Sequence, residues 1–214
     1  MRLKQLGNQW RVYMNPMDFH RLWACAESRR ACIAIRLGGE CGLRVSETSS
    51  VKPGDFREST DPSAKGHHFL GIYGKDTTGE TERGKFREVF VPAVLYQIIQ
   101  NEIEEEGYGP DDEIMPVTKR TVQEYIKRAA IACSERYDNE DYAKISSHDL
   151  RAFWATNLLV RHGVNEDVVK DLGGWVSREN MEPYLYAQFD DIIIDEMREA
   201  GIEGKTFFTG QQRD

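Results

Sequence analysis

The stretch 147–186 constrains this chain more than any other, because it spaces chemically active side chains along predicted helices. It holds a His and an Arg three residues apart, then a Gly-Gly-Trp, and a tyrosine nine residues after the tryptophan. Ser147 is a good N-cap, so we expect His148 and Arg151 on the first turn of a helix and on one of its faces. Backbone N–H groups at a helix start favour an anion, and the two side chains add donors and charge. The pattern predicts a phosphate site, with a downstream tyrosine as a possible nucleophile.

Two further segments supply groups that such a site needs. Gly42-Leu43-Arg44-Val45-Ser46-Glu47 offers a second arginine with an acidic residue three positions on. The runs 69–75 and 86–92 read as a β-hairpin, with Lys75 at its turn. Taken alone, Arg44 is equally well explained as a surface arginine, Glu47 as a first-turn helix residue, and Lys75 as a solvated hairpin lysine.

In chain order, these residues resemble the catalytic set of the tyrosine recombinases, the phage integrase family. The resemblance runs from about residue 15 to residue 187, and each element is weak by itself, whereas the complete ordered set is specific. It implies a mainly α fold with a small antiparallel β-sheet (α+β), and a DNA recombinase that needs no metal or other cofactor. The implied catalytic residues are Arg44, Lys75, His148, Arg151, Trp175 and Tyr184.

The resemblance also implies a role for each residue. Arg44 grips a non-bridging oxygen of the scissile phosphate, and Glu47 holds that arginine in place. Lys75 protonates the 5′-oxygen leaving group, with Lys85 as the fallback candidate. His148 assists proton transfer at the tyrosine, which forms a 3′-phosphotyrosine intermediate.

Two tyrosines compete for the role of nucleophile, Tyr184 and Tyr186. The family spacing selects Tyr184, which follows Trp175 by nine residues. Trp175 stands where the family more often has histidine. Pro183 directly before the tyrosine departs from the pattern, because proline removes a backbone donor and can bend a short helix.

Hydrophobic periodicity and cap residues predict the remaining elements. Residues 10–14 form a short β-like run and residues 51–68 a loop. We expect Gly38-Gly39 and Gly42 to break the second helix, and Ser177 to cap the helix that carries the tyrosine. The expected helices span residues 16–27, 29–38, 92–106, 118–137, 165–172 and 190–200.

The predicted helix from Thr118 carries the most basic stretch of the chain. The resemblance implies that this helix lies against double-stranded DNA, although a solvated charged face is a serious alternative. The candidate DNA-binding residues are Lys119, Arg120, Lys127 and Arg128. His67-His68 is too isolated for a metal site.

The expected organisation is an N-terminal segment (1–14), a catalytic domain (15–187), and a C-terminal helix and tail (188–214). By resemblance, that C-terminal helix docks on a neighbouring protomer within a synaptic tetramer on DNA. Only about fifteen residues precede the catalytic pattern, so we expect no separate core-binding domain within this chain. The chain is either an excised catalytic domain or a minimal integrase, and we expect it to bind DNA weakly on its own.

The net charge of −8 and the pI near 5.3 are unusual for a DNA-binding domain. Either positive charge gathers on one face, or the protein is adapted to high salt, as 18 arginines against 10 lysines also suggest. A halophilic archaeal or viral source is a hypothesis from this composition. The four cysteines form no C-x-x-C pair, and no apolar run could cross a bilayer, so we expect reduced thiols in a cytoplasmic protein.

Three functions remain open on the sequence. The first is a site-specific recombinase for integration or excision of a virus or mobile element. The second keeps the chemistry but changes the product, as in a type IB topoisomerase or a resolvase. The third is a non-catalytic DNA-binding descendant, which the complete residue set disfavours.

Overall fold

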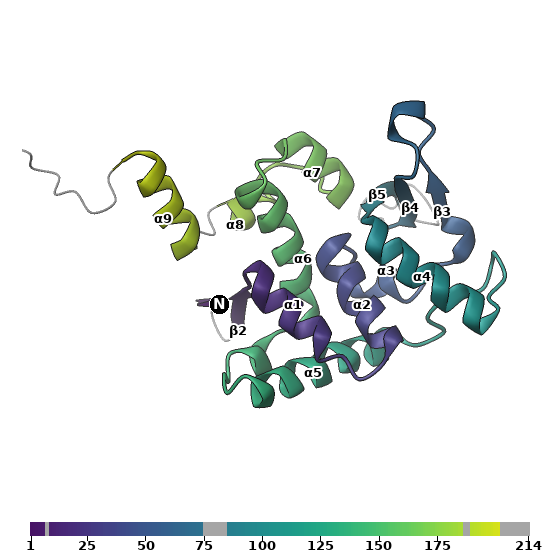
Figure 1. Ribbon diagram of the computed structural model, residues 1–214, viewed down its shortest axis with the longest axis horizontal. Helices are drawn as coiled ribbons and strands as arrows, with labels where there is room; N and C mark the ends of the chain where they lie inside the picture. Colours follow the sequence, from purple (N-terminus) through teal and green to yellow (C-terminus); the bar gives the residue numbers. More distant parts are fainter. Residues whose placement is uncertain (7–8, 75–84, 186–188, 202–214) are drawn as a thin grey trace, which may run out of the picture.

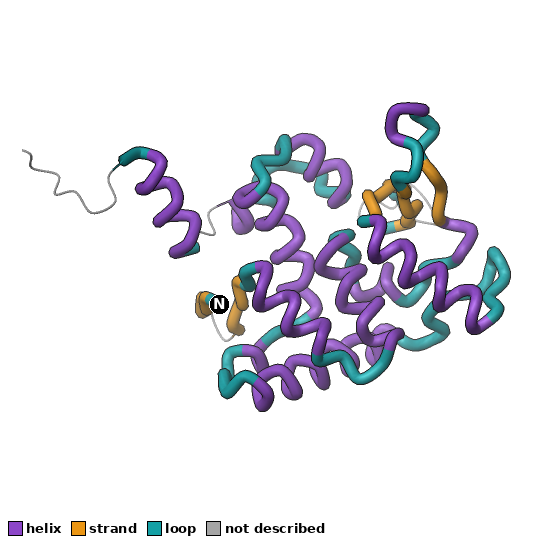
Figure 2. Tube along the Cα trace, in the orientation of Figure 1, coloured by secondary structure: helices purple, strands orange, loops and turns teal. Residues whose placement is uncertain are grey.

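The structure, a computed structural model, describes residues 1–6, 9–74, 85–185 and 189–201. It is mainly helical and carries two small antiparallel sheets that lie apart from one another (Figures 1 and 2). The predicted α+β class is therefore confirmed. The main helices in the described ranges are α1 (Pro16–Ala24), α2 (Arg29–Glu40), α3 (Val45–Thr48), α4 (Ala93–Glu106), α5 (Lys119–Arg136), α6 (Ser147–Thr156), α7 (Glu166–Gly173), α8 (Glu182–Leu185) and α9 (Asp190–Glu199).

Helix α2 lies at the centre and packs against α1, α4, α5 and α6. The prediction that Gly38 and Gly39 end this helix is wrong, since it continues to Glu40. Both glycines are buried where other helices approach closely. A Cβ at Gly39 would lie 2.1 Å from the Phe19 ring, and one at Gly38 would lie 3.0 Å from Leu150 Cδ1. These glycines therefore permit close helix packing.

The larger sheet has the order β3-β4-β5, from β3 (Phe56–Glu58), β4 (His68–Tyr73) and β5 (Phe86–Val91). β4 and β5 are the predicted hairpin strands. β3 corrects the prediction of a loop over residues 51–68, as it pairs Phe56 with Leu70. A strand of only three residues is too short for periodicity to reveal. Two 3₁₀ turns, η1 (Pro53–Asp55) and η2 (Pro62–Ala64), flank it.

The N-terminal segment forms a second hairpin from β1 (Arg2–Leu6) and β2 (Gln9–Tyr13). It is anchored to α6, because the Val12 N–H donates to Asp149 Oδ1 at 3.0 Å. Helix α1 then begins at Pro16, as predicted, with Asn15 as its N-cap, but it ends at Ala24, earlier than expected, with Cys25 as its C-cap.

Helix α6 begins one residue earlier than predicted, because Ser146 rather than Ser147 is its N-cap. The Asp149 Oδ2 atom accepts hydrogen bonds from the Ser146 N–H (2.9 Å) and hydroxyl (2.6 Å). His148 and Arg151 still share a face across the first turns. The helix runs on into a π-helical turn, η4 (Asn157–Arg161), and a 3₁₀ turn, η3 (Tyr142–Lys144), precedes it.

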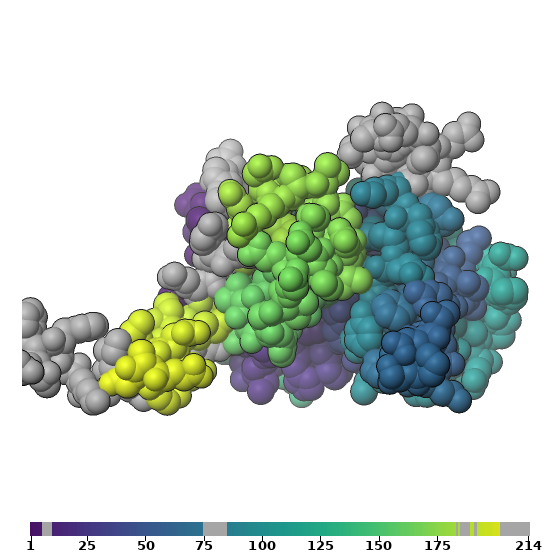
Figure 3. Space-filling view, turned by 90° about the horizontal axis from the view of Figure 1, so that it is seen from above, coloured from purple at the N-terminus to yellow at the C-terminus, as the bar shows by residue number. Residues whose placement is uncertain are grey.

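The C-terminal elements differ most from expectation. Helix α8 begins at Glu182, so the prediction that Ser177 caps it is wrong. The chain makes a turn instead, in which the Met181 N–H donates to the Arg178 carbonyl at 2.8 Å and the Met181 side chain is buried. Pro183 occupies the first turn of α8, where a missing N–H costs little. Helix α9 projects from the body (Figures 1 and 3).

Candidate active site

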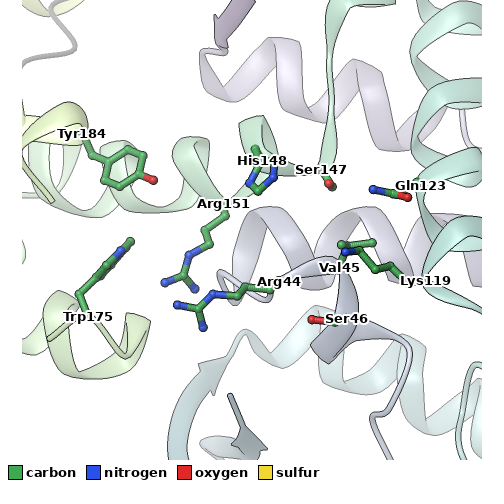
Figure 4. A pocket seen from close by; sticks show the side chains of 10 residues that line it. All are labelled: Arg44, Val45, Ser46, Lys119, Gln123, Ser147, His148, Arg151, Trp175 and Tyr184. Atoms are coloured by element: carbon green, nitrogen blue, oxygen red, sulfur yellow. The ribbon is translucent and has the colours of Figure 1, made fainter. Parts of the chain in front are cut away.

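Five of the six predicted catalytic residues line one pocket of about 290 Å³. They come from the start of α3, from α6, from the loop after α7 and from α8, and they face one another across the pocket (Figure 4). Lys75 lies outside the described residues, as does Tyr186. The lining residues are Arg44, Val45, Ser46, Lys119, Gln123, Ser147, His148, Arg151, Trp175 and Tyr184.

Arg151 is the buried cation at the base of the pocket. Its guanidinium donates to the Gly42 carbonyl and to the Gly173 carbonyl (2.5 Å), and lies over the Trp175 ring, 4.3 Å from the centroid. Burial, followed by the charges of Arg44 and Arg87, lowers the pKa of Arg151 to about 9, so it remains protonated at neutral pH. A bound anion would be stabilised by this concentration of positive charge.

Arg44 lies beside Arg151, with its guanidinium on the same side of the pocket (Figure 4). Its Nη1 donates to Glu47 Oε1 at 2.8 Å, and its backbone N–H donates to Glu47 Oε2 at 2.7 Å. The side chain keeps 38% of its surface exposed, which leaves donors available to a ligand. The structure thus places Glu47 behind Arg44, in contact with it.

Glu47 is buried and charged. Burial alone would raise its pKa, but the hydrogen bonds and charge of Arg87, followed by those of Arg44, outweigh that effect and hold the pKa at about 2. The carboxylate therefore stays ionised and offsets one of the nearby arginine charges.

Two aromatic rings, Trp175 and Tyr184, line one wall of the pocket, and Trp154 stacks against Trp175 from outside the lining. The Trp175 centroid lies 5.8 Å from that of Trp154 and 5.6 Å from that of Tyr184. Trp154 is buried, and the Tyr184 hydroxyl points into the pocket (Figure 4). The guanidinium carbon of Arg11, on β2, lies over the Tyr184 ring, 5.6 Å from its centroid. The Tyr184 ring thus has Trp175 and Arg11 as packing neighbours.

His148 is exposed at the start of α6, one turn before Arg151. Its ring lies between Ser147 and the tyrosine side of the pocket (Figure 4). Exposure suits a group that exchanges protons with a bound substrate.

The four basic residues predicted on α5 have different surroundings. Lys119 lines the pocket. Lys127 Nζ donates to the Ala143 carbonyl at 2.5 Å, and Arg128 pairs with Glu27 at 2.9 Å. Arg120 pairs with Glu124 on the same helix at 3.1 Å. The structure therefore brings Lys119 alone of these four to the pocket.

Sequence reasoning missed Arg87, which lies directly behind the pocket. Its Nη1 and Nη2 atoms each donate to one oxygen of Glu47 at 2.8 Å, and Nε donates to the Leu172 carbonyl at 2.9 Å. A signal was present, because strand alternation puts Arg87 on the same buried face of β5 as Val89 and Val91.

The site carries more positive than negative charge. The positive charges of Arg44 and Arg87 act on Arg151, and the carboxylate of Glu47 partly offsets them. Two guanidiniums side by side, next to an indole and a phenol hydroxyl, match the donors that a phosphate requires. Among the described residues, no cluster of three His, Cys, Asp or Glu side chains could hold a metal ion. In the same ranges, no helix has the length and apolar character needed to cross a bilayer.

Comparisons with solved structures find tyrosine recombinases of similar fold. XerA recombinase has a TM-score of 0.66 at 17% identity, over 88% of this chain and 65% of that one. XerH recombinase bound to its difH substrate has a TM-score of 0.62 at 17% identity, over 94% and 57%. A lambda integrase dimer bound to a COC′ core site has a TM-score of 0.58 at 16% identity, over 95% and 51%.

This chain thus spans between about half and two thirds of the length of these recombinases. A search of curated protein sequences gives no match. The sequence does match the profile described as "Phage integrase family" across residues 13–190, which contains all the residues of the pocket. The chain belongs to the phage integrase family, and its fold is that of the tyrosine recombinase catalytic domain.

Proposed function

We propose that this protein is a site-specific recombinase that cuts and rejoins DNA strands through a 3′-phosphotyrosine intermediate. The observation that supports this most directly is the single pocket that contains Arg44, His148, Arg151, Trp175 and Tyr184. Family membership and the recombinase–DNA complexes of similar fold agree with it.

In this mechanism the Tyr184 oxygen attacks the scissile phosphorus and loses its proton, with the assistance of His148. A bond forms from the tyrosine oxygen to phosphorus, while the bond from phosphorus to the 5′-oxygen breaks. Arg44, Arg151 and the Trp175 N–H offset the charge on the non-bridging oxygens in the pentacoordinate transition state. A 5′-hydroxyl of another strand can then attack the phosphotyrosine and rejoin the DNA.

The departing 5′-oxygen needs a proton. We propose Lys75 as its source and Lys85 as the alternative. Lys85 is exposed and directly precedes β5, and its carbonyl accepts a hydrogen bond from the Gly74 N–H at 2.9 Å. Each lysine is replaced by alanine and tested on DNA whose leaving group is a 5′-sulfur (a 5′-phosphorothiolate), which departs without a proton. The variant that lacks the proton donor should cleave ordinary DNA slowly but cleave this DNA at the wild-type rate.

The proposed partners are double-stranded DNA and further copies of the chain in a synaptic tetramer, in the cytoplasm. The lambda integrase structure is a dimer on a DNA core site, which supports assembly on DNA. Helix α9 exposes Ile194 (47%) and Met197 (41%), the kind of apolar surface that another protomer can cover. Ile194→Asp is expected to prevent assembly on DNA but to leave strand cleavage by a single protomer intact.

Integration or excision of a virus or mobile element is the proposed biological role. A type IB topoisomerase or resolvase would use the same groups, and only the reaction product separates these activities. Supercoiled plasmid with and without paired candidate sites distinguishes them, because a topoisomerase relaxes both, whereas a recombinase exchanges strands only between sites.

The decisive experiment uses a nicked suicide substrate, from which the cleaved fragment is lost, built on sequences that flank the gene. Denaturing gels compare the wild type with Tyr184→Phe and Tyr186→Phe. A covalent protein–DNA band that disappears only with Tyr184→Phe is the expected result. Loss only with Tyr186→Phe would move the nucleophile. No band from wild-type protein on DNA that it binds would favour a non-catalytic DNA-binding protein.

A further inference from the structure

Arg87 of β5 is a buried cation whose guanidinium bonds to other groups of the protein. Its side chain is 6% exposed, and Nε, Nη1 and Nη2 each donate a hydrogen bond, one to the Leu172 carbonyl and two to Glu47. A buried ion pair of this kind adds little net stability compared with apolar side chains of similar volume, because both ions lose their hydration. Stability alone therefore does not account for an arginine at this position.

The first contact of Arg87 leads to Arg44. Glu47 Oε1 accepts from Arg87 Nη1 and from Arg44 Nη1, each at 2.8 Å. Glu47 Oε2 accepts from Arg87 Nη2 at 2.8 Å and from the Arg44 backbone N–H at 2.7 Å. Two parallel bonds from Arg87 prevent rotation of the carboxylate. The carboxylate in turn sets the direction of the Arg44 guanidinium.

The second contact leads to the turn that carries Trp175. Arg87 bonds the Leu172 carbonyl and Arg151 bonds the next one, that of Gly173, so two cations hold successive carbonyls at the C-terminus of α7. Cations at this end also suit the helix dipole. Gly174 follows with φ +64°, and a Cβ there would lie 2.9 Å from Arg87 Cδ. Arg87 therefore contacts this turn at two points, the Leu172 carbonyl and Gly174.

We propose that Arg87 is a positioning residue for the phosphate site, which holds Arg44 through Glu47 and Trp175 through the end of α7. It is not among the residues that line the pocket, and it acts by keeping these two phosphate-binding groups in fixed relation. The inference rests on the proposed function and adds to it a residue that links the β-hairpin to the catalytic pocket.

The test compares Arg87→Lys with Arg57→Lys. Arg57 of β3 makes the same two-bond contact with a carboxylate, Glu88, beside Arg87 in sequence, but at the surface and away from the pocket. Lysine keeps the positive charge but lacks the two parallel N–H donors of the guanidinium. On the suicide substrate, Arg87→Lys is expected to slow single-turnover cleavage by about 10- to 100-fold, the usual effect of losing an orienting contact. Arg57→Lys should cleave at the wild-type rate.

A merely structural role predicts a different pattern. If Arg87 only stabilises the fold, Arg87→Lys would lower the unfolding midpoint and leave the cleavage rate of the folded protein unchanged, which would overturn the proposal. DNA affinity, measured separately, is expected to change by less than about threefold, since contacts with the DNA backbone outside the pocket supply most of it. In a Glu47→Gln background, Arg87→Lys should slow cleavage by a smaller factor than in the wild type, because the route through the Glu47 carboxylate is already lost and only the contact with the end of α7 remains. Additive losses would contradict this route.

A second variant covers the case in which Arg87→Lys fails to fold. Gly174→Ala adds a methyl group in contact with Arg87 and alters no charge. Gly163→Ala is its control, because Gly163 also has a positive φ (+58°) but has open space around it. Slower cleavage by Gly174→Ala than by Gly163→Ala is expected. Equal rates would argue against the proposal.

A measurement without DNA separates this inference from the proposed function. Inorganic phosphate is titrated while the indole N–H signal of Trp175 is followed by NMR. Arg87→Lys should need about fivefold more phosphate than Arg57→Lys to shift that signal, because its arginine donors are no longer fixed. If wild-type protein forms no covalent DNA complex, the proposed function fails, whereas this titration still decides the role of Arg87. Identical titrations would overturn it.

Discussion

The guanidinium of Arg151 lies over the ring of Trp175, 4.3 Å from the centroid, while it donates hydrogen bonds to carbonyls on both sides of the pocket. This stacking joins the α6 helix to the turn after α7, and the Tyr184 ring packs against Trp175 at a tilt of 43°. The phosphate-binding groups and the candidate nucleophile are therefore parts of one packed unit.

Replacement of Trp175 tests that unit. Trp175→Phe keeps a ring under Arg151 but loses the indole N–H, and we expect cleavage about tenfold slower, equivalent to ~1.4 kcal/mol. Trp175→Ala also loses the cation–π contact and should be slower still, by about another tenfold. Single-turnover cleavage is the measurement. Trp10→Phe, at an exposed position of β2, is the control. Equal rates for the two Trp175 variants would show that the ring face contributes nothing.

Arg44→Lys should separate catalysis from folding. Glu47 keeps its two bonds to Arg87, so the unfolding midpoint is expected to stay near that of the wild type. Cleavage should fall by about 100- to 1,000-fold, as expected when a donor to the transition state is lost. Arg57→Lys on β3, where the side chain is 42% exposed and pairs with Glu88, is the matched control. A cleavage rate for Arg44→Lys equal to that of the control would remove Arg44 from the catalytic set.

The ionisation of Glu47 predicts how stability depends on pH. Its folded-state pKa of about 2 lies below the ordinary value of 4.5, so its carboxylate stabilises the fold above pH 4.5. That contribution is lost as the pH falls from 4.5 toward 2. Glu47→Gln is expected to lower the free energy of unfolding at pH 7 by about 3 kcal/mol, since each pKa unit corresponds to ~1.4 kcal/mol.

Urea unfolding at pH 7, 4 and 3 measures this effect. The difference between wild type and Glu47→Gln should shrink steadily across that series. Glu88→Gln, which removes the surface partner of Arg57, should show a smaller difference at every pH. A constant difference for Glu47→Gln would mean that packing, and not charge, explains the loss.

Gly42→Ala is expected to destabilise the protein for two reasons. Gly42 has φ +68°, which costs about 1–2 kcal/mol for a residue with a Cβ. Its added Cβ would also lie 2.5 Å from the Trp154 ring, and overpacking costs about 1–3 kcal/mol more. Gly66→Ala has a positive φ (+83°) with open space around it, so it measures the backbone cost alone. Equal losses in urea unfolding would show that Trp154 moves aside freely.

The sequence by itself determined the local features of this protein. The cap residues Asn15, Ser28, Thr118 and Asn165 begin helices because their side chains bond free N–H groups nearby in the chain. The hairpin strands, the buried stripes and the order of the pocket residues could also be predicted, because each depends on neighbours within a few positions or on a motif of fixed spacing.

Only the tertiary structure decided the contacts between segments that are far apart in the sequence. Gly38 and Gly39 are expected to break a helix on local propensity, yet Phe19 and Leu150 pack against them and the helix continues. Lys119 and Lys127 look equivalent on α5, but the first lines the pocket and the second bonds Ala143. Arg87 acquires its partners, Glu47 and Leu172, from segments 40 and 85 residues away in the chain. Long-range contacts of this kind come from the packing of whole elements, which no local pattern encodes.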